Sequence, residues 1–159
     1  MKKAVIFYSF DGNSSLISEI IKTSIDADVF EIKTVDTKKR KGLMKFLWGG
    51  YQVLAKKKPE LKPLSFDANT YDFLVLGTPV WAGAPAPALV SFLSSNIIKG
   101  KKLALFCCHG GGMGKTLDKM KALLPGNTIV SELDFKEPRS EKRLELASKI
   151  TEWVKSFGI

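Results

Sequence analysis

Histidine and cysteine are scarce in this chain of 159 residues, which contains one histidine and two cysteines. The sequence shows no His and Cys spacing typical of a metal site, no serine triad and no paired carboxylates for acid and base catalysis. Cys107 and Cys108 are adjacent, so they do not form the framework of spaced bridges found in small secreted proteins. We therefore expect no metal ligands, no disulfide and no side chain that acts as a catalytic group by itself.

Charged residues are absent between Phe73 and Ile98, a length that would span a bilayer. The apolar run after Met1 is too short for a secretion signal, because polar residues follow Tyr8. We therefore expect a cytoplasmic protein without a transmembrane helix. The uncharged run is interpreted as a strand, a loop and a helix, because it contains Gly77, Pro79, Gly83, Pro85 and Pro87.

Acidic residues are outnumbered by basic ones, 16 against 25, which gives a net charge of +9. The segment from Lys38 to Lys62 holds nine basic residues and one acidic residue, so it carries +8. This basic insertion, about 38–62, indicates a local contact with an anionic partner rather than a generally cationic protein. Its lysines are not interleaved with aromatic residues as in a base-stacking surface, so we expect no nucleic acid.

A helix from Leu43 to Ala55 is predicted within the basic insertion, because apolar residues recur there at helical spacing. A face this broad is expected to be mostly buried. Two interpretations remain open. The helix packs on the sheet as an ordinary crossover connection, or it docks to an acidic redox partner or peripherally to an anionic membrane surface. The apolar face consists of Leu43, Met44, Leu47, Tyr51 and Leu54.

Apolar segments with strand character alternate with helical patterns along the whole chain. This alternation predicts a single α/β domain over residues 1–159, with a three-layer, doubly wound sheet of five parallel strands. The expected strands are Ala4–Tyr8, Val29–Val35, Phe73–Leu76, Leu103–Cys108 and Thr128–Phe135. A final helix is expected from Ser140 to Ser156, with one apolar face made of Leu144, Ala147, Ile150 and Val154.

Ligands of such sheets bind at the edge where the parallel strands end. Three loops lie there: Ser9–Ser14, Thr78–Gly83 and Cys108–Gly114. The third resembles a nucleotide triphosphatase loop at its end, but His109 stands where that loop needs its first glycine, so we reject this function. Ser9–Ser14 is a better anion site, because its hydroxyls and a helix N-terminus converge there. Ordinary turn and N-cap chemistry would use the same residues.

Three motifs follow one another in order: Tyr8-Ser9-Phe10-Asp11-Gly12-Asn13-Ser14, then Gly77-Thr78-Pro79-Val80-Trp81-Ala82-Gly83, then His109-Gly110-Gly111-Gly112. In residues, order and spacing the chain resembles the flavodoxin family, and most closely its short-chain flavodoxin-like branch. The resemblance covers essentially the whole chain. It implies a five-stranded sheet of order 2-1-3-4-5 with the cofactor FMN bound at the strand ends.

The resemblance also implies which residues bind FMN. The phosphate would lie in the first loop, held by the side chains of Ser9, Asn13 and Ser14 and by backbone N–H groups of Phe10, Asp11, Gly12 and Asn13. One face of the flavin ring would be lined by Thr78, Pro79, Val80, Trp81, Ala82 and Gly83, with Trp81 stacked on it. The other side would be lined by Cys108, His109, Gly110, Gly111 and Gly112.

Three of these residues allow more than one interpretation. Trp81 either stacks on the flavin or fills a gap between its loop and the core. His109 either acts as a general acid or hydrogen-bond donor to the flavin, or is a structural residue of its loop. Asp11 replaces the threonine usual in the family, so its carboxylate is expected to point outward while its N–H faces the phosphate.

The resemblance implies a redox function in which FMN supplies the chemistry. We favour an electron carrier that passes single electrons between partner proteins, and the basic insertion makes an acidic docking surface on such a partner one of the expected alternatives. The alternative is an FMN-dependent oxidoreductase that takes hydride from NAD(P)H and reduces a quinone. A third hypothesis, from another class, is an interaction module that binds no flavin.

Overall fold

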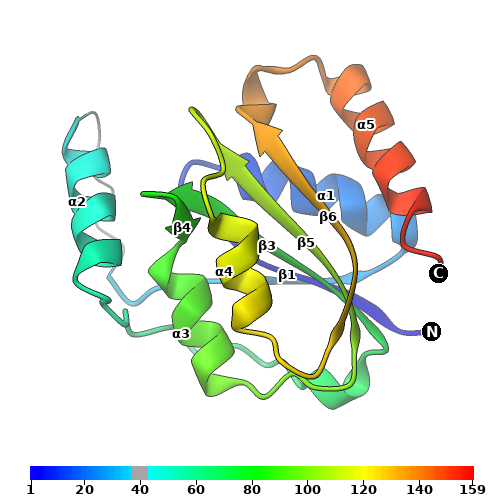
Figure 1. The fold of residues 1–159 in the computed structure, drawn as a ribbon. Coiled ribbons are helices and arrows are strands. Elements are labelled where there is room, and N and C mark those ends of the chain that lie inside the picture. The colour runs from blue at the N-terminus through cyan, green and yellow to red at the C-terminus, as the bar shows by residue number, and fades with distance from the viewer. Residues whose placement is uncertain (37–42) are drawn as a thin grey trace.

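The computed structural model of the protein describes residues 1–36 and 43–159, so the basic residues at positions 38–41 lie outside the described residues. A parallel sheet forms its centre, with the strand order β2-β1-β3-β5-β6 (Figure 1). This confirms the α/β class that the sequence predicts. The strands are β1 (Lys3–Tyr8), β2 (Asp28–Ile32), β3 (Phe73–Trp81), β5 (Lys102–His109) and β6 (Thr128–Lys136).

The expected count of five strands omits a sixth, β4 (Ala84–Pro85), which pairs antiparallel with β3. The turn between them contains Ala82 and Gly83, whose φ angles of 49° and 67° are both positive. Two positive φ angles in a two-residue loop are typical of a tight hairpin. The hairpin is not apparent in the sequence, because its second strand has only two residues.

Helices cover both faces of the sheet. α1 (Asn13–Ile25) and α5 (Arg143–Lys155) pack on one face, and α3 (Pro87–Ser95) and α4 (Thr116–Ala122) pack on the other. α2 (Leu43–Leu54) stands to one side of the sheet, at the edge of the molecule (Figure 1). Two short 3-10 helices, η1 (Ala68–Thr70) and η2 (Pro138–Ser140), precede β3 and α5.

The central strands are buried on both faces, which explains their continuous apolar sequences. Alternate residues of β1 enter different cores: Phe7 packs with residues of α1 and α5, whereas Ile6 packs with residues of α3 and α4. The uncharged run from Phe73 to Ile98 becomes β3, β4 and α3. Among the described residues, no helix combines the length and apolar character needed to cross a bilayer.

The apolar face expected for the last helix is confirmed at Ala147, Ile150 and Val154, which pack on the core, and is wrong at Leu144. α5 begins at Arg143 rather than Ser140, and it buries Leu146, Ile150 and Trp153, while Leu144 is 86% exposed. Both sets of residues recur at helical spacing, so the pattern alone does not distinguish them. Trp153 decides the orientation, because its ring packs against three core phenylalanines and its Nε1–H donates to Ser131 Oγ at 2.9 Å.

Gly77 allows β3 to pack tightly against the core beneath the site. A Cβ atom at this position would lie 2.0 Å from Cζ of Phe106, which is fully buried between Phe135 and Trp153. The Phe106 ring therefore occupies the space that any other residue at position 77 would need. Packing rather than backbone conformation requires glycine here.

We expect Gly77→Ala to destabilise the fold by about 1 to 3 kcal/mol, because the methyl group overpacks the core. Chemical denaturation followed by circular dichroism measures this change. Gly111→Ala is the matched control, since a Cβ there meets nothing within 4 Å. A Gly77→Ala variant as stable as Gly111→Ala would contradict the packing argument.

Candidate functional site

A cavity of about 210 Å³ opens where the parallel strands end. Its lining comes mainly from the carboxyl ends of β3 and β5 and from the loops that follow β1, β3 and β5, which the fold brings to one edge of the sheet. Most of the residues predicted to bind a cofactor meet here. They are Ser9, Phe10, Asp11, Asn13, Ser14, Pro79, Val80, Trp81, Ala82, Cys108, His109 and Gly110.

Other predicted site residues lie outside this lining: Gly12, Thr78, Gly83, Gly111 and Gly112. Thr78 is buried, and its hydroxyl oxygen accepts a hydrogen bond from the Ala86 N–H at 3.0 Å, which gives it a structural role. Gly83 lies in the β3–β4 turn, where its carbonyl accepts from the Lys115 N–H. Gly12 is the N-cap of α1, and Gly111 and Gly112 are exposed.

The first loop ends at the N-terminus of α1, whose first N–H groups have no partner within the helix. Ser9 Oγ accepts one of these bonds, from the Ser15 N–H at 3.2 Å. Ser14 Oγ is buried at the same helix end beside the Cys108 thiol, and it forms no hydrogen bond of normal geometry among the described residues. A buried, unpaired hydroxyl costs free energy unless a ligand accepts its hydrogen bond. The loop therefore offers donors to an anion.

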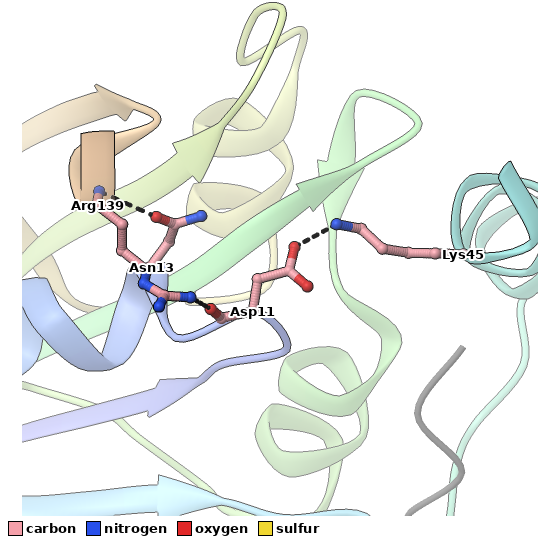
Figure 2. A network of polar contacts seen from close by, with 4 residues as sticks. All are labelled: Asp11, Asn13, Lys45 and Arg139. Atoms are coloured by element: carbon pink, nitrogen blue, oxygen red, sulfur yellow. Dashed lines mark hydrogen bonds and ion pairs between the residues drawn. The ribbon is translucent and has the colours of Figure 1, made fainter. Parts of the chain in front are cut away.

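Arg139 of η2 is distant from the first loop in the sequence, but it contacts the loop in the structure (Figure 2). Its backbone N–H donates to Asn13 Oδ1 at 3.2 Å, and its guanidinium Nη1 donates to the carbonyl oxygen of Asp11. The same guanidinium lies 3.5 Å from the position of a Cβ at Gly12. A positive charge is thus held directly beside the turn that precedes α1.

Asp11 does not leave an unbalanced negative charge at this loop. Figure 2 shows its carboxylate directed toward α2, where Lys45 Nζ forms an ion pair with Oδ2. Lys45 and Arg139 together carry two positive charges against the one of Asp11 at this loop, while the Glu137 carboxylate lines the cavity near Gly110, in the third loop. The loop remains favourable to an anion despite the acidic residue that the sequence places in it.

Aromatic rings close the cavity on the side of α2. Trp48 of α2 stacks on Phe10 with ring centroids 6.1 Å apart, and its ring lies edge-on to Trp81 at 5.3 Å. Trp81 also makes edge contacts with Tyr8 and Phe10, and it lies against the backbone of Gly49. The cavity is consequently smaller than the roughly 300 to 1,000 Å³ of typical ligand pockets.

His109 lines the opposite side of the cavity. Its Nε2 lies 2.8 Å from Oδ2 of Asp134 on the neighbouring strand β6. Because a carboxylate only accepts, Nε2 carries a hydrogen and donates it to Asp134. Within the described part of the chain, Nδ1 is buried and has no partner. Asp134 thus holds the ring with one nitrogen left for a ligand.

Several residues at the site are not predicted from the sequence: Lys45, Gly49 and Gly50 of α2, Glu137 and Arg139 after β6, and the supporting Trp48 and Asp134. A fourth loop at the same edge follows from five parallel strands, so the segment after β6 was a detectable candidate. No local pattern indicates that α2 reaches the site. Its contribution depends on tertiary packing.

The chain matches a known protein family over almost its whole length. A flavodoxin family model matches residues 2–156. None of the curated proteins compared with the chain matches it.

The solved structures that share the fold include the following three. A flavoprotein of Lactobacillus acidophilus NCFM, solved in complex with FMN, has a TM-score of 0.74 and 22% identity, covering 96% of this chain and 98% of the other. A putative flavoprotein of Bacteroides eggerthii has a TM-score of 0.78 and 17% identity, covering 99% and 98%. Oxidised flavodoxin 2 of Bacillus cereus has a TM-score of 0.61 and 18% identity, covering 99% and 98%.

Burial makes the two thiols and one phenol near the site poor acids. It raises the pKa of Cys107 and of Cys108 to about 12, from the 9.0 of a free thiol. It also raises the pKa of Tyr8 to about 12, from 10.0, with a further contribution from the negative charge of Asp11. These groups stay protonated at neutral pH, which agrees with a structural role for the cysteines.

We expect the free energy of unfolding to fall as the pH rises from about 9 toward about 12. In this window the unfolded chain releases protons from these groups and the folded chain retains them, so the stabilisation present below pH 9 is lost. Denaturation at a series of pH values measures the slope. The double variant Cys107→Ala/Cys108→Ala should show a shallower decline, and an unchanged slope would contradict the assignment.

Proposed function

The chain belongs to the flavodoxin family, and on this premise we propose that it binds FMN and carries electrons between partner proteins. The observation that carries the proposal is the buried Ser14 hydroxyl at the N-terminus of α1, which forms no hydrogen bond of normal geometry among the described residues and lines the cavity. A phosphate monoester supplies the acceptor oxygens that this hydroxyl and the adjacent N–H groups lack.

The residues of the first loop fit a phosphate group. Ser9, Asn13 and Ser14 line the cavity at the helix end, where the helix dipole favours an anion. Arg139 adds a formal positive charge within the same loop, and Lys45 offsets Asp11. These residues would hold the phosphate by charge-assisted hydrogen bonds, which are stronger than neutral ones.

The remaining lining has the chemistry that suits the flat ring of a flavin. Trp81 and Pro79 present apolar surface from the β3 loop, and His109 and Gly110 present polar and backbone groups from the β5 loop. When bound, FMN supplies the redox chemistry. The chain's own contribution is to position the ring, to exclude water with Trp48 and Trp81, and to offer His109 Nδ1 as a polar contact to the ring.

The close packing of aromatic rings beside the cavity favours the electron carrier over the oxidoreductase that uses NAD(P)H. Phe10, Trp48 and Trp81 pack against one another beside a cavity of about 210 Å³. Admission of a flavin ring already requires these side chains to rearrange. A nicotinamide ring stacked on the flavin would require still more space on the same side, whereas electron transfer to a partner protein requires access only to a ring edge.

We expect Ser14→Ala to weaken FMN binding roughly 10- to 100-fold, the effect of losing one hydrogen bond to a charged group. Riboflavin has the same ring without the phosphate, so its affinity should change less than about twofold. Quenching of flavin fluorescence on titration with the protein measures both dissociation constants. Equal losses for the two ligands would show that Ser14 does not contact the phosphate.

Ser18→Ala is the matched control for this variant. Ser18 lies one turn further along α1, and its hydroxyl is also buried without a partner in the described chain, but it does not line the cavity. Both substitutions remove an unsatisfied hydroxyl, so both should leave the free energy of unfolding unchanged or slightly higher. Only Ser14→Ala should weaken FMN binding.

A kinetic comparison distinguishes the carrier from the oxidoreductase. We expect the photoreduced, FMN-loaded protein to reduce a one-electron protein acceptor such as ferricytochrome c. With NAD(P)H and a quinone, we expect turnover no faster than that of free FMN at the same concentration. Saturable oxidation of NAD(P)H that depends on the protein would instead establish the oxidoreductase.

A further inference from the structure

The outer face of α2 is an exposed apolar stripe. It consists of Met44, Leu47, Tyr51 and Leu54, whose side chains are 62%, 58%, 56% and 82% exposed. Their spacing of three, four and three residues places them along one side of the helix. The expectation that this broad apolar face would be buried is therefore wrong for these four residues, and the Leu43 side chain lies outside the described residues.

The polarity of α2 is inverted relative to an ordinary surface helix. Its polar residues face the protein: Lys45 pairs with Asp11, and Gln52 lines the space between the helix and the body of the molecule. Trp48, on the same inner side, packs against Phe10 and Trp81. These contacts fix the rotation of the helix and leave the apolar stripe exposed on its outer side.

Exposed lysines continue from the C-terminal end of the stripe. Lys56, Lys57 and Lys58 follow α2 directly, and Lys57 Nζ lies 5.7 Å from the ring centre of Tyr51. These three lysines also line a groove with Lys119 of α4, so positive charge extends beyond the helix. From residue 43 to residue 62, Glu60 is the single acidic residue. Lys57 thus joins the cations to the apolar stripe at Tyr51, while Lys57 and Lys58 also border the space between α2 and the body of the molecule.

This combination matches an anionic lipid surface. Aliphatic side chains enter the boundary between headgroups and acyl chains, tyrosine rings lie at the interface, and lysines remain among the headgroups. Each lysine close to an anionic leaflet strengthens binding roughly fivefold. A symmetric contact between two copies would instead bring like charges together, in a chain whose net charge is +9.

A redox partner protein fits this surface less well. The inner side of α2 lines the cavity through Lys45, Gly49 and Gly50, so the outer stripe is separated from the site by the helix itself. A helix with its side chains is about 10 Å across. A protein that binds the stripe would therefore not lie against the cavity.

We propose that the outer face of α2 (Met44, Leu47, Tyr51 and Leu54) and the adjoining Lys56, Lys57 and Lys58 form a peripheral membrane-binding surface for anionic phospholipid. The apolar stripe lies in the headgroup region of one leaflet, and the three lysines contact the phosphate and carboxylate groups of the lipids. The inner face of α2 keeps its contacts with Asp11 and Trp81 in this arrangement. The proposal does not depend on FMN binding.

Vesicle co-sedimentation of the full chain tests the proposal. We expect binding to phosphatidylcholine vesicles that contain about 30 mol% phosphatidylserine, and much weaker binding to phosphatidylcholine alone. Raising the salt from about 0.1 M to about 1 M shortens the Debye length from about 10 Å to about 3 Å and should weaken the binding. Absence of binding to the anionic vesicles at low salt would overturn the proposal.

Two variants locate the binding surface. The triple variant Lys56→Gln/Lys57→Gln/Lys58→Gln should weaken binding at least tenfold. Its matched control removes three exposed lysines elsewhere, at Lys22, Lys142 and Lys155, and should bind within about threefold of the wild-type chain. An equal loss in both would indicate unspecific attraction by net charge and would overturn the assignment to α2.

Leu54→Gln tests the apolar stripe and should weaken binding about tenfold. It is chosen because Leu54 is 82% exposed, so the substitution should leave the thermal unfolding midpoint unchanged. Leu144→Gln, at a leucine 86% exposed on α5, is its control and should not alter binding. A wild-type dimer in sedimentation equilibrium that Leu54→Gln dissociates, without vesicle binding, would assign the stripe to a second copy and overturn the proposal.

Discussion

The parallel register of β1, β3 and β5 is the constraint on which the site depends. Phe7 pairs with Gly77, and Gly77 pairs with Phe106, so the three strands run level as they approach the carboxyl edge. This register brings together loops that are about 70 and 30 residues apart in the chain. It also requires Gly77, because the Phe106 ring fills the space beside it. The same packing that stabilises the sheet therefore positions the cavity.

Short-range patterns in the sequence predict the parts of the molecule that obey them. Continuous apolar runs indicate β1, β3 and β5 because these strands are buried on both faces, and Pro87 with the apolar residues after it indicates α3. Most of the residues predicted for the three loops meet in the cavity, because parallel strands end at one edge. The hairpin to β4 and the rotation of α5 were not predicted, since they depend on one short pairing and on the packing of Trp153.

The orientation of α2 is the feature that the sequence pattern predicts least well. An apolar helical face normally predicts burial, yet four of its residues are exposed while Lys45 faces inward. Two interactions with the first loop account for this rotation: the Lys45–Asp11 ion pair and the packing of Trp48 on Phe10. Neither is visible in the sequence, because the partners are 34 and 38 residues apart.

The first loop illustrates how charge is balanced by residues remote in sequence. Asp11 alone would oppose an anion at the N-terminus of α1, and local reasoning expects its carboxylate to point outward. The structure directs that carboxylate to Lys45 and places Arg139 against the Asp11 carbonyl from the other side. Lys45 belongs to α2 and Arg139 to η2, so the loop becomes suited to a phosphate only when both elements pack on it. The anion site is therefore a product of the tertiary fold, and its charge cannot be judged from residues 9–14 alone.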